Sequence, residues 1–150
     1  MKVDWEFILM ISEWVIPPKQ KSQASHSMEK MGGGMTEANY FTINVKSAPA
    51  IPPLKVKKGE HIRVRFINAG NQVHPMHLHG HTFKIISTDG FPLSNKGHMK
   101  DTLPVNAGER FDVIFKADNP GTWAFHCHDL HHVTNDGIYP GGLLTLVQYE

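Results

Sequence analysis

Two histidine-rich clusters contain most of the residues in this sequence that could do chemistry. The first runs from His74 to His81 and reads HPMHLHGH, and the second runs from His126 to His132 and reads HCHDLHH. Together they hold eight of the 11 histidines and the single cysteine, Cys127. Imidazole nitrogen and thiolate sulfur bind soft, redox-active metals, and two histidines with one cysteine form the trigonal ligand set of a blue-copper centre. Zinc is disfavoured, because no second cysteine completes the usual paired spacing.

The elements that would position these clusters are predicted to be strands. Residues 61–68 (HIRVRFIN) alternate apolar and polar side chains, and residues 122–128 lead directly into the second cluster. Further strands are expected over 5–15, 40–45, 82–88, 101–105, 110–116 and 143–149, with turn residues between them and no helical period. This pattern predicts an all-β sandwich or barrel.

The length of 150 residues fits one domain spanning residues 1–150. We expect residues 1–39 to form an N-terminal strand followed by a Gly- and Met-rich loop, and residues 40–150 to form the core that carries the clusters. A composition with 13 Gly, 10 Pro and 19% charged residues suits a compact β-domain with many turns.

Charge and hydropathy argue against two classes of partner. The net charge of +1 does not indicate a polyanion, and no aromatic residues interleave with the short basic run at 55–58, so no nucleic acid is expected. No stretch approaches the roughly 20 apolar residues of a membrane span. Residues 1–14 lack the basic start and the cleavage site of a signal peptide.

Strand alternation divides the candidate ligands into two groups that face opposite ways. Alternate residues of an extended segment share a side, so Cys127 points away from its neighbours His126 and His128. By the same rule His77 and His79 share a side, and His74 falls on the other. The inward group is therefore His74 and Cys127, and the outward group is His77, His79, His126 and His128.

The inward group needs a third ligand. His132 lies five residues after Cys127, a distance over which a short loop can fold back, and His131 is its competitor. The four outward imidazoles would repel one another when protonated, so one or two further metal ions are expected to satisfy them.

The two clusters resemble the copper-binding signature of multicopper oxidases, specifically of their C-terminal cupredoxin domain. The resemblance extends over residues 40–149 and includes the segments FTIN (41–44), VKKGE (56–60), RFIN (65–68), KDT (100–102), GER (108–110) and ADNPG (117–121). It implies a cupredoxin-like Greek-key β-sandwich, copper as the cofactor and an extracytoplasmic location, periplasmic or secreted.

The resemblance also implies roles for individual residues. It makes His74, Cys127 and His132 the ligands of a type 1 copper, and it makes His77, His79, His126 and His128 ligands of type 2/type 3 coppers. Electrons would pass from Cys127 through its covalent neighbours. For the axial direction of the type 1 site we expect either Ile138 or solvent, and hence no axial sulfur.

A complete trinuclear cluster in this family takes four His-x-His pairs, and this chain has two. The other pairs would come from further copies of the chain, in a face-to-face dimer or in a cyclic trimer like that of the related copper nitrite reductases and two-domain laccases. A third arrangement leaves the outward histidines partly empty. We favour a homo-oligomer, with the trimer ahead of the dimer.

These features favour a copper-dependent oxidoreductase that takes electrons from a small-molecule or protein donor and passes them to a small oxidant such as O2 or a nitrogen oxide. The alternatives are an electron carrier or copper-binding protein with only the type 1 site occupied, and a copper storage module.

Three further features have two readings each. The loop that contains His26, Met28, Met31 and Met35 either recruits copper or, as we favour, is a polar loop without this role. His81 is expected to support a ligand rather than to bind metal. Asp129 either orients a histidine or faces solvent.

Overall fold

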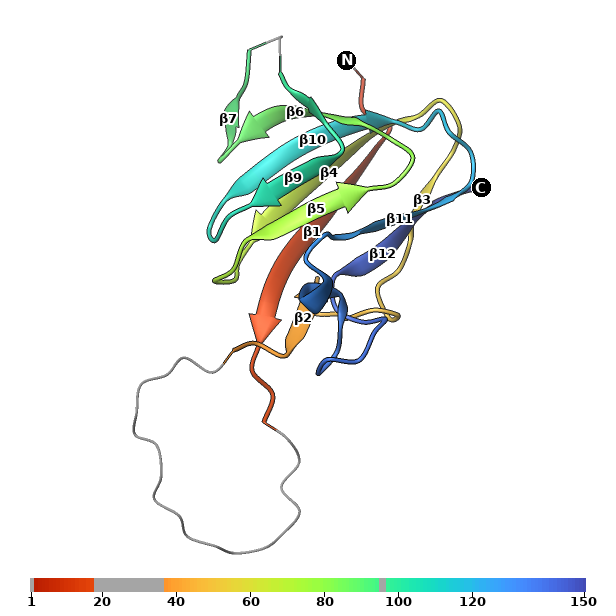
Figure 1. Ribbon diagram of the computed structural model, residues 1–150. Coiled ribbons are helices and arrows are strands. Elements are labelled where there is room, and N and C mark those ends of the chain that lie inside the picture. Colours follow the sequence, from red (N-terminus) through yellow and green to blue (C-terminus); the bar gives the residue numbers. More distant parts are fainter. Residues whose placement is uncertain (1, 18–36, 95–96) are drawn as a thin grey trace, which may run out of the picture.

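A computed structural model describes residues 2–17, 37–94 and 97–150 (Figure 1). These residues form two β-sheets. The first sheet has the order β2-β1-β4-β10-β6-β7, with β8 also paired to β6. Its strands are β1 (Trp5–Trp14), β2 (Tyr40–Ile43), β4 (His61–Asn68), β6 (Phe83–Thr88), β7 (Phe91–Pro92), β8 (Met99–Lys100) and β10 (Arg110–Lys116).

The second sheet has the order β3-β12-β11-β5-β9. Its strands are β3 (Leu54–Val56), β5 (His74–Leu78), β9 (Thr102–Val105), β11 (Thr122–Cys127) and β12 (Leu144–Tyr149), and the 3-10 helix η1 (Leu130–Val133) follows β11. Of the helices in the described ranges, none has the length and apolar character needed to cross a membrane.

The core lies between the two sheets and follows the alternation of the sequence. In β4 the side chains of Ile62, Val64 and Phe66 are fully buried, whereas the residues between them are partly exposed. Phe66 meets Phe125 of β11 edge-to-face, with ring centroids 5.7 Å apart. Because apolar side chains from both sheets fill one core, the all-β sandwich is confirmed.

Strand β1 is a central strand of the first sheet. It runs parallel to β4, with Leu9 opposite Phe66, and antiparallel to β2, with Ile11 opposite Ile43. In Figure 1 it crosses the length of the sandwich and ends beside β2 and η1. The last residues of β1 therefore lie at the end of the sandwich to which the second histidine cluster leads.

The predicted strands agree with the structure to within one or two residues at their ends. Four further strands were not predicted as such: the short strand β3, β5, which begins the first histidine cluster, and the two-residue strands β7 and β8. The helix η1 was also missed, because four residues are too few to show a helical period.

Candidate metal centre

Strand pairing brings the two histidine clusters together. Strands β5 and β11 are antiparallel neighbours, and their register sets His126 opposite His77 and Cys127 opposite Met76. Residues on one side of both strands are buried, whereas His77 and His126 on the other side are partly exposed. The predicted division into an inward and an outward group is what the structure has.

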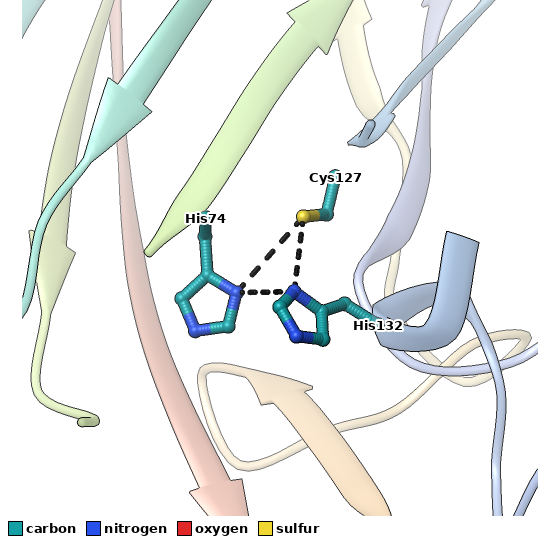
Figure 2. A group of neighbouring side chains, drawn as sticks. All are labelled: His74, Cys127 and His132. Carbon is teal, nitrogen blue, oxygen red and sulfur yellow. Dashed lines mark hydrogen bonds between the residues drawn. The ribbon is translucent and has the colours of Figure 1, made fainter. Parts of the chain in front are cut away.

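The inward group closes into a triad with His132. His74 and Cys127 have no exposed surface and His132 is 4% exposed. The Cys127 Sγ lies 3.4 Å from His132 Nδ1 and 3.9 Å from His74 Nδ1, and the two Nδ1 atoms are 3.1 Å apart (Figure 2). Two ring nitrogens and one sulfur thus converge on one point, and we call these three residues the inward triad.

Helix η1 places His132, rather than its neighbour His131, beside Cys127. The helix begins after Asp129, whose carboxylate accepts a hydrogen bond from the backbone N–H of His131. Asp129 is thus an N-cap residue, which satisfies one of the free amides of the helix start. The turn of the helix buries His132 beside Cys127 and leaves His131 exposed, with its Nε2 3.4 Å from the carbonyl oxygen of Ala38.

The outer nitrogens of both triad histidines are also held. His74 Nε2 lies 2.7 Å from the carboxylate of Glu13, and His132 Nε2 lies 2.7 Å from the side-chain oxygen of Gln72. Because these oxygens accept hydrogen bonds, each neutral imidazole carries its proton on Nε2 and turns the Nδ1 lone pair toward Cys127. Two lone pairs 3.1 Å apart repel each other, and a metal ion between them would relieve that repulsion.

Burial determines the protonation of the triad. It lowers the pKa of His132 to about 4, with the positive charge of a protonated His74 as a second cause. It also lowers the pKa of His74, although Glu13 acts in the opposite direction. Burial raises the pKa of the Cys127 thiol to about 12. Near neutral pH both imidazoles are therefore ready to bind a metal, whereas the thiol must first lose its proton.

The outward histidines, His77, His79, His126 and His128, gather on the opposite side of the same two strands. His79 Nε2 is 2.9 Å from His126 Nε2, and the ring of His77 lies 4.8–5.7 Å from the other three rings. Burial, followed by the charges of the neighbouring imidazoles, lowers the pKa of His79. Imidazoles that stay unprotonated keep a free lone pair, so this cluster is suited to bind a metal ion.

Two of the outward histidines have a fixed orientation. His77 Nδ1 is 3.0 Å from the Asp101 carbonyl oxygen and 2.8 Å from Thr102 Oγ1, and His126 Nδ1 is 2.7 Å from the Cys127 carbonyl oxygen. Nδ1 therefore donates in both rings, and Nε2 is the atom left to bind. Thr102 reaches His77 because β9 places it directly opposite on the sheet.

Comparison with known proteins identifies the family. A family model described as multicopper oxidase matches residues 17–138. The multicopper oxidase MmcO of Mycobacterium tuberculosis is 36% identical over 112 residues, which are 75% of this chain and 21% of that protein. The chain belongs to the multicopper oxidase family. Copper is accordingly its cofactor, and the soft nitrogen and sulfur donors of the triad fit that metal.

Two solved multicopper oxidase structures share the fold. The blue copper oxidase of Nitrosomonas europaea superposes with a TM-score of 0.82 at 44% identity, over 96% of this chain and 43% of that one. The multicopper oxidase mgLAC gives a TM-score of 0.81 at 41% identity, over 97% and 44% of the two chains. The cupredoxin-like fold is therefore confirmed. The chain spans about a fifth of its curated relative MmcO and less than half of either solved chain.

His81 supports the outward face of this multicopper oxidase chain from within. It is 7% exposed, with Nδ1 3.0 Å from the His79 carbonyl oxygen and Nε2 2.7 Å from the Tyr149 hydroxyl. Both ring nitrogens of His81 therefore make hydrogen bonds within the fold, and its supporting role toward a ligand stays a prediction.

The expectation for the axial direction is wrong as far as Ile138 is concerned. Its side chain is 71% exposed, because residues 135–138 form a surface turn, closed by hydrogen bonds between Asn135 and Ile138. The fully buried Leu143 is an apolar residue whose backbone makes hydrogen bonds to the triad: its carbonyl oxygen accepts one from Cys127 N, and its N–H donates one to the His132 carbonyl oxygen.

The predicted His26–Met35 loop lies outside the described residues.

Sequence reasoning missed Glu13 and Gln72. Neither belongs to a histidine cluster, and Glu13 precedes its partner His74 by 61 residues on a different sheet. No residue type or spacing in the sequence indicates this contact; only the structure shows that a Cβ atom at Gly70 would lie 2.7 Å from Glu13 Cδ.

Proposed function

We propose that this chain is the part of a copper-dependent oxidoreductase that receives electrons at a type 1 copper held by His74, Cys127 and His132. The observation that carries the proposal is the convergence of two imidazole nitrogens and one thiol sulfur, all buried, within 3.1–3.9 Å of one another. A copper ion with this ligand set supplies reversible one-electron chemistry.

The protein's own contribution is a rigid, dry frame. Glu13 and Gln72 fix the two imidazole tautomers, and the backbone of Leu143 bonds to both Cys127 and His132. The ring of Phe41 packs 4.5 Å from that of His132. Side chains held in this way need little rearrangement when the charge of the site changes, which favours electron transfer.

We further propose that Cys127 and its two neighbours connect the inward triad to a second copper site. His126 and His128 are joined to Cys127 by single peptide units and point to the opposite side of the strand. His126 also reaches back, with Nδ1 2.7 Å from the carbonyl oxygen of Cys127. Covalent bonds and one hydrogen bond thus span the distance between the two groups of ligands.

A surface pocket is the proposed place of electron entry. It has a volume of about 240 Å³ and is lined in part by Glu13, Gln72, Trp14 and Glu37. Glu13 and Gln72 also touch the outer nitrogens of the triad histidines. A small-molecule donor, or a side chain of a protein donor, would therefore come within one residue of the ligands.

The outward histidines form, in this proposal, half of a copper cluster that a further copy of the chain completes. Four imidazoles with two Nε2 atoms 2.9 Å apart on a partly exposed face support a site shared between subunits. We favour a homo-oligomer, with a trimer ahead of a dimer, in which a small oxidant such as O2 or a nitrogen oxide is reduced. Family membership also favours a periplasmic or secreted location.

Metal analysis combined with electron paramagnetic resonance and sedimentation tests the proposal. We expect more than one copper per chain, one of them with a type 1 signal and an intense visible thiolate-to-copper band, in an oligomer. Cys127→Ser should abolish the band and leave the outward copper. One copper per chain in a monomer would identify an electron carrier instead, and a band that survives in Cys127→Ser would refute the type 1 assignment.

A further inference from the structure

Glu13 is a buried carboxylate aimed at a ligand of the inward triad. Its side chain is 6% exposed, and its Oε1 lies 2.7 Å from His74 Nε2. It belongs to β1, outside the range 17–138 in which the chain matches the family model. Glu13 therefore stands apart from the residues by which the family is recognised.

The carboxylate is held by the turn that precedes β5. Its Oε1 accepts a hydrogen bond of 2.8 Å from the backbone N–H of Gln72, and its Oε2 accepts one of 3.0 Å from that of Asn71. Three donors, the two amides and His74 Nε2, thus surround the carboxylate. The anion is thus fixed in one position.

Gly70 makes room for this arrangement. A Cβ atom at that position would overlap the Glu13 carboxylate and lie 2.7 Å from Cδ and 3.2 Å from Cγ. The same turn bonds to Glu13 through two amides and, through Gln72, to the outer nitrogen of His132. One turn and one strand end therefore orient both triad histidines.

We propose that Glu13 is a positioning residue that sets the reduction potential and the Cu(II) affinity of the inward triad. The inference rests on the proposed type 1 site. A carboxylate that accepts a hydrogen bond from a ligand imidazole makes that ligand more basic, and its negative charge in a buried site favours the more positive metal ion. Glu13 thus stabilises Cu(II) relative to Cu(I) and lowers the potential.

The test compares Glu13→Gln with Glu6→Gln in the full copper-loaded chain. The glutamine keeps the shape of the side chain and removes its charge. We expect about a tenfold loss of preference for Cu(II) over Cu(I), which raises the potential of a one-electron couple by about 59 mV. Glu6 lies on the same strand, where it pairs with Arg63 and Arg65, so Glu6→Gln should leave the potential unchanged.

Gly70→Ala provides a second variant that keeps the charge. The added methyl group pushes the carboxylate away from His74, so the potential should rise in the same direction but by less than in Glu13→Gln. If Glu13→Gln does not fold, the reduction potential of Gly70→Ala alone tests the inference. Potentials equal to that of the wild type in the variants that fold would overturn the inference.

The readouts are redox titration of the visible band and competition for Cu(II) with a chelator, and neither depends on turnover. If the wild-type chain binds copper without the thiolate band, the proposed function fails and this inference fails with it. If the wild type has the band and the Glu13 and Gly70 variants leave its potential unchanged, the inference alone fails.

Discussion

His132 Nδ1 lies 3.4 Å from the sulfur of Cys127, five residues earlier in the chain, because helix η1 turns the chain back over the end of β11. The adjacent His131 is exposed, and its Nε2 lies 3.4 Å from the carbonyl oxygen of Ala38. This difference between neighbours of the same residue type distinguishes the proposed ligand, His132, from His131.

We expect His132→Ala to abolish the type 1 signal and His131→Ala to preserve it. Both variants remove one imidazole from η1, so a general effect on the helix would appear in both. Absorption and electron paramagnetic resonance of the copper-loaded proteins measure the outcome. Loss of the signal in His131→Ala alone would show that His131, and not His132, binds the copper.

Much of this site was predictable from alternation. Because β5 and β11 are regular, the spacing of His77, His126 and Cys127 was enough to predict which side each would face. Glu13 was not predictable, because its approach to His74 depends on how the end of β1 packs against the turn that connects β4 of the first sheet to β5 of the second. Pairing between sheets leaves no period in the sequence.

The same reasoning explains the error at Ile138. The sequence offered several apolar residues after His132, and nothing in their spacing showed that residues 135–138 form a surface turn. The backbone hydrogen bonds of Leu143 to Cys127 and His132 exist only in the folded chain.

We propose that the buried side chain of Leu143, whose backbone bonds to both Cys127 and His132, occupies the axial direction of the proposed type 1 site. Leu143→Met should then lower the potential of that site, whereas Ile138→Met should not change it. A thioether in the axial direction donates electron density to copper, and the axial ligand is one of the factors that tune such sites. The exchange of Leu for Met conserves volume, so we expect it to cost less than about 1.5 kcal/mol of folding stability. Redox titration measures both variants, and an equal shift in the two would contradict the assignment of Leu143.

The copper-free protein should lose stability as the pH falls from 6.5 toward 4. His132 has a pKa of about 4 in the fold, because of burial and then His74, and an ordinary value of 6.5 when unfolded. Between these values the unfolded chain binds more protons, so the free energy of unfolding decreases as the pH falls. Urea unfolding across this range is the measurement. His132→Gln should show a weaker dependence, and a midpoint that rises on acidification would contradict the argument.

Copper binding at the inward triad should release about one proton per ion at neutral pH. The thiol of Cys127, with a pKa of about 12, must be deprotonated, whereas burial keeps the pKa of both triad histidines below 6.5, so they have no proton to lose. Titration with copper in weak buffer containing a pH indicator counts the protons. Cys127→Ser removes this thiol and retains the outward histidines, so the difference between the two titrations isolates the triad. A difference near zero would mean that the sulfur is not a ligand, whereas a difference near two would mean that a triad histidine is also protonated before copper binds.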